Sequence, residues 1–202
     1  MPEAEGARDF VYLASASPRR GELLRQLGVH FRVLAADIDE NRLSAEAAEG
    51  YVARLAAAKA EAGWERLRAE ERAPVLGADT TVLVGDEVLG KPVDRADAMR
   101  MLGRLSGGIH VVLTGVALRD AGGVRFRLSR SEVRFRVIEP AEAAAYWDTG
   151  EPRDKAGGYA IQGFGAAFVR DLSGSFSGVM GLPLFETAQL LIEARVPLWR
   201  RP

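Results

Sequence analysis

The alternation of hydrophobic and polar positions divides this chain into short apolar runs, which predict strands, and longer stretches with helical spacing. Residues 10–14 form an apolar run that predicts a buried strand. Ser17 and Pro18 then suit the cap and the first turn of a helix, and Gly28 suits the left-handed position that ends one. The chain therefore begins with a predicted strand that leads directly into a helix.

The remaining pattern mixes strands, helices and a hairpin. Apolar runs predict further strands at 31–36, 74–84, 109–118, 124–137 and 167–172. Helical spacing predicts helices at 45–68, 94–105, 141–148 and 183–194. Gly85 and Asp86 suit a turn into a short strand at 87–89. Asp94 with Asp97 resembles a pair that caps a helix. The pattern as a whole predicts an α/β protein in which helices flank a mixed sheet.

Length and charge narrow the class of protein. A chain of 202 residues allows one domain, or two lobes that share a core. The residues before the first predicted strand are polar, so we expect a frayed start at 1–9 and a single domain at 10–202. A formal net charge of -1 argues against binding to nucleic acid, which needs a cluster of Lys and Arg. Without a run of about 18 apolar residues or a signal-peptide pattern, we expect a cytoplasmic protein with no membrane partner.

The composition also limits the chemistry. The chain contains no cysteine, which excludes disulfides, thiolate metal sites and a cysteine nucleophile. A metal therefore has to bind to carboxylates or histidine. His30 and His110 are not spaced as metal ligands, and the sequence lacks the nucleophile elbow of Ser-His-Asp hydrolases. We expect structural roles for both histidines.

A candidate anion site opens the first helix. The run Ser15-Ala16-Ser17-Pro18-Arg19-Arg20 places two hydroxyls, the free N–H groups of a helix start and two guanidinium groups close together. This combination suits a triphosphate. The alternative is an ordinary capped helix whose arginines lie on the surface. The motif alone does not decide between the two.

Two acidic segments contain candidate metal ligands. Asp37-Ile38-Asp39-Glu40 follows a predicted strand, and Asp79 lies within one, among apolar neighbours where an unpaired carboxylate would be costly to bury. Both segments place oxygens where a hard cation could bridge the protein and a phosphate. The alternatives are a solvated loop for residues 37–40 and a structural carboxylate, bonded to backbone amides, for Asp79.

Two lysines and two glycine-rich segments complete the candidates. Lys91 is held at a turn by Pro92, where it could reach a phosphate. Lys59 lies inside the long predicted helix, so a solvated helix face and a ligand contact are equally open. The segments 154–163 and 178–184 would let a ligand approach the backbone, although turns in proteins without a ligand have the same composition. Together these features suggest a triphosphate site with a metal.

Four stretches carry a resemblance to a known family. They are LASASPRRGELLRQLG at 13–28, DIDE at 37–40 with RLAAAKA at 54–60, GADTTV with LGKP within 77–92, and DKAGGYAIQG with GLPL within 154–184. With these motifs the chain resembles the Maf family over residues 10–194. The resemblance implies a long curved mixed sheet flanked by helices, two lobes with an active-site cleft in the Maf/ITPase-like manner, and a homodimer.

The same resemblance implies a role for each candidate residue. Asp79 corresponds to the acceptor of the proton from the attacking water, and Glu40 with Asp79 corresponds to ligands of Mg²⁺ or Mn²⁺. The implied phosphate-binding residues are Ser15, Ser17, Arg20, Lys59 and Lys91. The implied reaction is metal-assisted attack of water on the α-phosphorus of a nucleoside triphosphate, which releases the monophosphate and pyrophosphate.

Three positions bear on the base of the nucleotide. Arg19, Thr80 and Gln162 match the family branch that is similar to dTTP/UTP pyrophosphatases, whereas the branch that acts on N7-methyl-GTP tends to carry other residues there. The amide of Gln162 offers one donor and one acceptor, which complements a thymine or uracil imide. Two alternatives stay open: an N7-methyl-GTP pyrophosphatase, and a nucleotide-binding regulator of cell division or septum formation.

Overall fold

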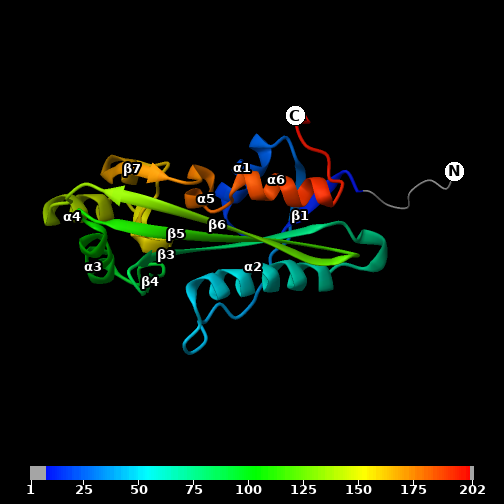
Figure 1. Ribbon diagram of the computed structural model, residues 1–202, viewed down its shortest axis with the longest axis horizontal. Coiled ribbons are helices and arrows are strands. Elements are labelled where there is room, and N and C mark those ends of the chain that lie inside the picture. Colours follow the sequence, from blue (N-terminus) through cyan, green and yellow to red (C-terminus); the bar gives the residue numbers. More distant parts are fainter. Residues whose placement is uncertain (1–7, 201–202) are drawn as a thin grey trace. The chain divides into compact units, whose positions relative to one another are not determined.

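A mixed sheet organises the structure, a computed structural model that describes residues 8–200 (Figure 1). Over these residues the sheet has seven strands in the order β2-β1-β3-β5-β6-β7, and β4 pairs with β3. The strands are β1 (Phe10–Leu13), β2 (His30–Val33), β3 (Val75–Val84), β4 (Glu87–Leu89), β5 (Ile109–Asp120), β6 (Gly123–Phe135) and β7 (Val169–Ser173). β1 runs parallel to β2 and β3, whereas β4 and β7 run antiparallel to β3 and β6. The predicted α/β class is confirmed.

The helices follow the predicted pattern with shifted ends. They are α1 (Pro18–Gln26), α2 (Ala48–Glu65), α3 (Arg95–Leu105), α4 (Pro140–Asp148), α5 (Phe176–Met180) and α6 (Leu184–Glu193). Short 3-10 helices lie at Ala69–Glu71, Glu151–Asp154, Ala156–Gly158 and Phe164–Phe168. α5 and the 3-10 helices are too short for helical spacing to predict them. Within residues 8–200, no helix is long and apolar enough to cross a membrane.

The chain divides into two compact units, each with its own core. In the described residues the first unit comprises 8–79, Gly115–Leu128 and 181–200, and the second comprises Thr80–Thr114 and Ser129–Met180. Strands β3, β5 and β6 contribute to both. The predicted frayed start lies mostly outside the described residues, but Asp9 is described and pairs with Arg200 at 3.0 Å. The predicted cleft between two lobes stays a prediction.

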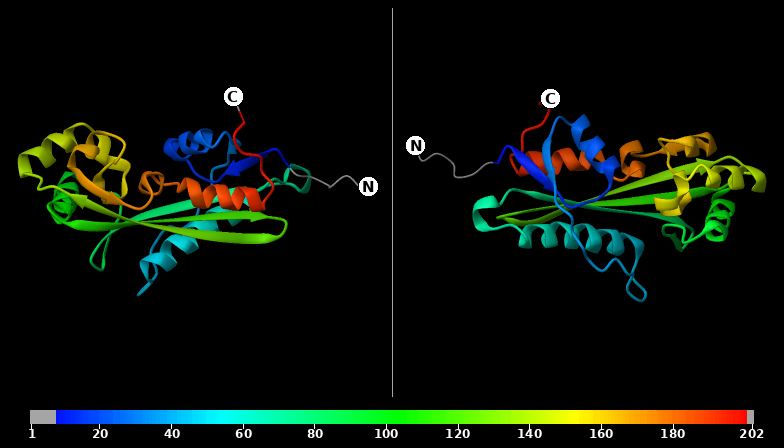
Figure 2. Two further views of the ribbon diagram at one scale, coloured as in Figure 1. Left: turned by 45° about the horizontal axis from the view of Figure 1, so that its top comes forward. Right: turned by 180° about the vertical axis from the view of Figure 1, so that it is seen from behind.

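Close packing of α2 on β3 shapes the first unit. In Figures 1 and 2, α2 covers one face of the sheet, and α1 and α6 lie on the other. A Cβ atom on Gly77 would lie 2.3 Å from the carbonyl oxygen of Ala56 and 2.7 Å from the amide nitrogen of Ala60. Position 77 therefore has room for no side chain, and the backbones of helix and strand touch directly. This contact fixes α2 and the residues it carries relative to β3.

Aromatic rings fill part of the core of the second unit. His110 is only 1% exposed, and its Nε2 lies 2.8 Å from the hydroxyl of Tyr159. Its ring meets Phe135 edge to face, with 4.8 Å between the centroids. Burial lowers the pKa of His110 to about 4, so the ring is neutral at neutral pH. The burial and the contacts of His110 agree with the structural role predicted for it.

The buried His110 should make stability depend on pH. Its pKa in the folded state lies below the unfolded value of 6.5, so its stabilising contribution is present above that pH and is lost as the pH falls toward about 4. From about pH 7 to about pH 5, the free energy of unfolding should fall by about 2 kcal/mol through this group. Urea unfolding of wild type and His110→Gln at both values measures the effect.

The exposed His30 supplies the control for this prediction. His30→Gln should keep the loss of stability at acid pH, and His110→Gln should remove most of it. A full loss in His110→Gln would show that another group causes it.

Candidate active site

An ammonium group between two carboxylates forms the centre of the candidate site, within the first unit. The Nζ atom of Lys59, on α2, lies 2.8 Å from Oδ1 of Asp79 on β3 and 2.7 Å from Oε1 of Glu40. Lys59 and Asp79 are only 8% and 7% exposed, whereas half of the Glu40 side chain is exposed. The site therefore has a buried ion pair with a carboxylate at its rim. A solvated face for Lys59 is wrong.

The position of the ion pair follows from the contact at Gly77. Alternate residues of a strand share a face, so Asp79 points to the same side as position 77, toward α2. On α2, Lys59 directly precedes Ala60 and follows Ala56 by three positions, about one helical turn, so it lies close to the two residues that touch Gly77. Lys59 and Asp79, 20 residues apart, are thereby brought together.

Burial and charge act in opposite directions on Asp79. Burial raises the pKa of its carboxyl above the ordinary value, and the charges of Lys59 and Arg20 offset part of this rise. Burial also lowers the pKa of the Arg20 guanidinium. A buried carboxylate with a raised pKa is a stronger base than an exposed one, which suits acceptance of a proton. The Asp79 carboxylate is thus held by the side chain of Lys59, and not by backbone amides as in the alternative.

The start of α1 forms the predicted cluster of hydroxyls and guanidinium groups. The hydroxyl oxygen of Ser15 accepts hydrogen bonds from the Ser17 amide (3.2 Å) and from Nη1 of Arg20 (3.0 Å). Nε of Arg20 donates to the carbonyl of Gly181 (2.8 Å), which ties in the second glycine-rich segment. Arg19, next to Arg20, is half-buried. The cluster therefore lies within the first unit, like the ion pair.

The predicted side-chain cap by Ser17 is wrong. Ser17 does stand at the N-cap position of α1, but its hydroxyl makes no capping hydrogen bond within the described residues. Instead, the Ser15 hydroxyl holds the Ser17 amide. The side chain of Ser17 therefore does not block the first turn of α1, where N–H groups attract anions.

Thr80 and Lys91 belong to the second unit. Thr80 follows Asp79 directly, and its Oγ1 lies 3.0 Å from Oγ1 of Thr114, which donates to the carbonyl of Gly178. Lys91 is exposed on the turn after β4. The neighbouring Gly90 carbonyl accepts the amide of Gly157 (2.9 Å), so this turn lies against the first glycine-rich segment.

Tyr146 and Glu151 hold the loop that carries Gln162, which is exposed. The Tyr146 hydroxyl accepts the amide of Ala160 (3.0 Å) and donates to Oε1 of Glu151 (2.7 Å). On the other side of Gln162, the Glu151 carboxylate accepts the amides of residues 164 and 165, both at 3.0 Å. A Cβ on Gly163 would lie 2.0 Å from that carboxylate, so only glycine fits there. Neither Tyr146 nor Glu151 is predicted as a site residue, because no local pattern links them to this loop.

The groups that could hold a metal are few. Among residues 8–200, no three His, Asp or Glu side chains lie together as a metal site. Glu40 and Asp79 supply carboxylate oxygens, the ligands that Mg²⁺ and Mn²⁺ prefer, and the Lys59 ammonium already bonds to both. Two protein carboxylates leave coordination positions for water and phosphate oxygens, as in many Mg²⁺ sites that act on phosphates.

The fold and the site together define the class. The protein is a mixed α/β protein in which a serine–arginine helix start and a buried acid–lysine pair share one compact unit. The particular family is the Maf-like one, since the model of the family described as "Maf-like protein" matches residues 10–194. The chain belongs to this family, and the resemblance predicted from its motifs is confirmed.

Relatives of the chain carry the name "dTTP/UTP pyrophosphatase". The protein from Aromatoleum aromaticum is 53% identical over 199 residues, which cover 93% of this chain and 97% of the relative. The protein from Alkalilimnicola ehrlichii is 53% identical over 196 residues, 96% of each chain. The protein from Hahella chejuensis is 49% identical over 199 residues, 98% of this chain and 99% of the relative. These names agree with the branch predicted from Arg19, Thr80 and Gln162.

If the buried ion pair stabilises the protein, the effects of changing Lys59 and Asp79 on the free energy of unfolding should not be additive. Lys59→Met leaves the Asp79 carboxylate buried with less positive charge, which should lower the free energy of unfolding by about 3 kcal/mol. Asp79→Asn leaves Lys59 paired with Glu40 and should cost less. The double variant should cost about 1–3 kcal/mol less than the sum of the single variants. Urea unfolding of the four proteins measures this coupling.

Lys91→Met is the matched control, because Lys91 is exposed. It should change the free energy of unfolding by less than about 0.5 kcal/mol. If the effects of Lys59→Met and Asp79→Asn simply add, the pair does not stabilise the protein in solution.

Proposed function

We propose that the protein hydrolyses dTTP and UTP to the monophosphate and pyrophosphate. The observation that carries the proposal is the buried Asp79, paired with Lys59, in the same unit as the serine–arginine start of α1. It occurs in a Maf-family chain whose relatives, at 49–53% identity, are named dTTP/UTP pyrophosphatase. A protein that only bound nucleotides would have no need of a buried base.

Asp79 is the proposed proton acceptor. Water attacks the α-phosphorus, its proton passes to the Asp79 carboxylate, and the bond from the α-phosphorus to the bridging oxygen breaks, so that pyrophosphate leaves. The raised pKa of Asp79 favours this transfer. Charge builds up on the phosphate oxygens during the attack, and nearby cations stabilise it.

The cations of the site hold the triphosphate in this proposal. Arg20 and the amides at the start of α1 bind phosphate oxygens, with Ser15 and Ser17 as hydroxyl partners. Lys59 and Lys91 add two point charges. Arg20 is already oriented by Ser15 and by the Gly181 carbonyl, so binding needs little reorganisation.

A divalent cation, Mg²⁺ or Mn²⁺, is the proposed cofactor, held by Glu40 and Asp79. The place fits a cation because both carboxylates already stabilise a positive group, the Lys59 ammonium. When bound, the metal neutralises phosphate oxygens and acidifies water. We also propose that the enzyme works in the cytoplasm without nucleic-acid or membrane partners, and that it forms the homodimer that the family resemblance implies.

Pyrophosphate release from a panel of nucleoside triphosphates, with Mg²⁺ or Mn²⁺, tests the function. Wild type should turn over dTTP and UTP, and Asp79→Ala should lower kcat about 100- to 10,000-fold because the base is lost. Asp86→Ala, which changes an exposed aspartate on the β3–β4 turn, should leave kcat as it is.

Other results would contradict the proposal in different ways. Turnover of N7-methyl-GTP alone would overturn the base preference and keep the mechanism. Tight binding of nucleotides without turnover would favour the regulator of cell division.

Gln162, with Arg19 and Thr80, is the proposed determinant of the base. Gln162→Glu replaces the amide donor with a second acceptor, so one carbonyl of thymine or uracil loses its partner. The ratio kcat/KM for dTTP and UTP should fall about 10- to 100-fold. Gln189→Glu, an exposed change of the same kind on α6, serves as control. Equal kcat/KM values for wild type and Gln162→Glu would exclude a direct contact with the base.

A further inference from the structure

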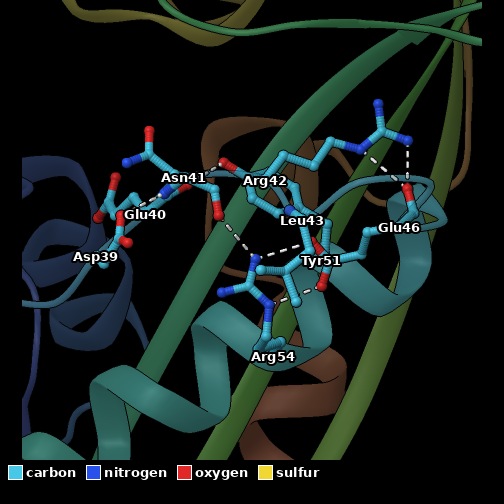
Figure 3. Close-up of polar contacts among 8 residues, drawn as sticks. All are labelled: Asp39, Glu40, Asn41, Arg42, Leu43, Glu46, Tyr51 and Arg54. Carbon is cyan, nitrogen blue, oxygen red and sulfur yellow. Dashed lines mark hydrogen bonds and ion pairs between the residues drawn. The ribbon is translucent and has the colours of Figure 1, made fainter.

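Glu40 lies in a segment without regular secondary structure, between β2 and α2. No ladder of backbone hydrogen bonds holds such a segment, so side chains have to fix it. Figure 3 shows the contacts that do so: some join residues of the segment to each other, and others come from Tyr51 and Arg54 on α2. The hydroxyl of Tyr51, in the first turn of α2, donates to the backbone carbonyl of Glu40 (2.9 Å).

Arg54 connects α2 to two residues of the segment, Glu46 and Asn41. Its Nε and Nη2 atoms donate to the two carboxylate oxygens of Glu46 (2.6 and 2.8 Å), and Nη2 also donates to the carbonyl of Asn41 (3.0 Å; Figure 3). This two-pronged geometry is specific to arginine. The hydrogen bond from Arg54 holds the pKa of Glu46 down to about 2, so the pair is charged at every working pH.

Glu46 in turn fixes the turn of the segment. Its carboxylate accepts the amide of Leu43 (3.1 Å), and its carbonyl accepts Nε of Arg42 (2.9 Å). Between them, Ala45 has a φ of 58°, a left-handed conformation that residues with a side chain rarely adopt. The local sequence does not favour this backbone, so the contacts of Glu46 and Arg54 have to impose it.

We propose that Arg54, with Glu46 and Tyr51, is a positioning device that holds Glu40 against Lys59. Tyr51, Arg54 and Lys59 all belong to α2, so one helix sets both the backbone of Glu40 and the partner of its carboxylate. None of the three positioning residues has to touch the nucleotide. The inference rests on the proposed function, in which Glu40 takes part in hydrolysis.

The test compares Arg54→Met with Arg68→Met. Arg68 makes a similar two-pronged pair with Glu71 (3.1 and 2.9 Å), which includes no residue of the Glu40 segment. Arg54→Met should lower kcat/KM for dTTP and UTP about 10- to 100-fold, since small misplacements of a reacting group have effects of this size. It should also weaken Mn²⁺ binding, measured by electron paramagnetic resonance, and speed hydrogen exchange at residues 40–46. Arg68→Met should change none of the three.

A double variant separates positioning from general stabilisation. Glu40→Gln should already have a low kcat/KM, and adding Arg54→Met should lower it by less than about 2-fold. Effects that multiply in full would show that Arg54 does not act through Glu40, which would overturn the proposal. Tyr51→Phe, which removes only one hydroxyl, takes the place of Arg54→Met if that variant does not fold.

The two proposals fail in different ways. A wild type that turns over no nucleotide overturns the proposed function, and hydrogen exchange and Mn²⁺ binding then still decide whether Arg54 positions the segment. Normal turnover by wild type, with unchanged exchange at 40–46 in Arg54→Met, overturns the positioning alone.

Discussion

The direct contact between α2 and β3 at Gly77 is the constraint on which the site depends. Because the helix backbone fills the place of a side chain at position 77, helix and strand cannot slide past each other. The strand period then points Asp79 at the helix, and the helix period brings Lys59 to meet it. A carboxylate buried there without a counter-ion would be costly, so the same contact that buries Asp79 also supplies the charge that makes its burial tolerable.

Charge balance around this contact explains how a chain with a net charge of -1 could handle a highly charged substrate. Two acids, Glu40 and Asp79, lie with two cations, Lys59 and Arg20, and the charges of Glu40, Lys59 and Arg20 all act on the titration of Asp79. Cations and acids thus lie close together in the first unit, so in the proposed function phosphate binding is local and needs no broad basic surface. A triphosphate with a divalent cation brings charges of both signs, and each finds an opposite group in place.

Periodicity and turn residues were enough to predict most of the fold. The strand and helix at the start, the β3–β4 hairpin and the Asp94 cap all follow from local pattern, and the structure confirms them. The ends of elements were harder: the strand predicted at 31–36 is only His30–Val33, because apolar composition continues past the last paired residue. Ser17 lies at the N-cap position of α1 as predicted, but within the described part of the chain its hydroxyl makes no capping hydrogen bond, and its own amide donates to the Ser15 hydroxyl.

The site residues were predictable as members of motifs, but not their partners. Local sequence does not decide whether the Lys59 side chain faces solvent or a ligand. Its two carboxylate partners come from other elements, Glu40 from a loop and Asp79 from a strand. Tyr146 and Glu151 belong to no motif. They hold the loop of Gln162 only because this loop folds back onto them. Long-range contacts of this kind depend on tertiary packing, which local sequence patterns do not specify.

The segments of Glu40 and Gln162 solve one physical problem in the same way. An exposed side chain cannot be held by burial, so its backbone has to be fixed instead. In each segment a glutamate, Glu46 or Glu151, accepts backbone amides, and a tyrosine hydroxyl bonds to the backbone close by. The anchoring groups are themselves held by a neighbouring helix or by the core, so both exposed side chains are aimed by residues that need not meet the ligand. This arrangement leaves the functional carboxylate and amide accessible to a ligand while their main chains stay ordered.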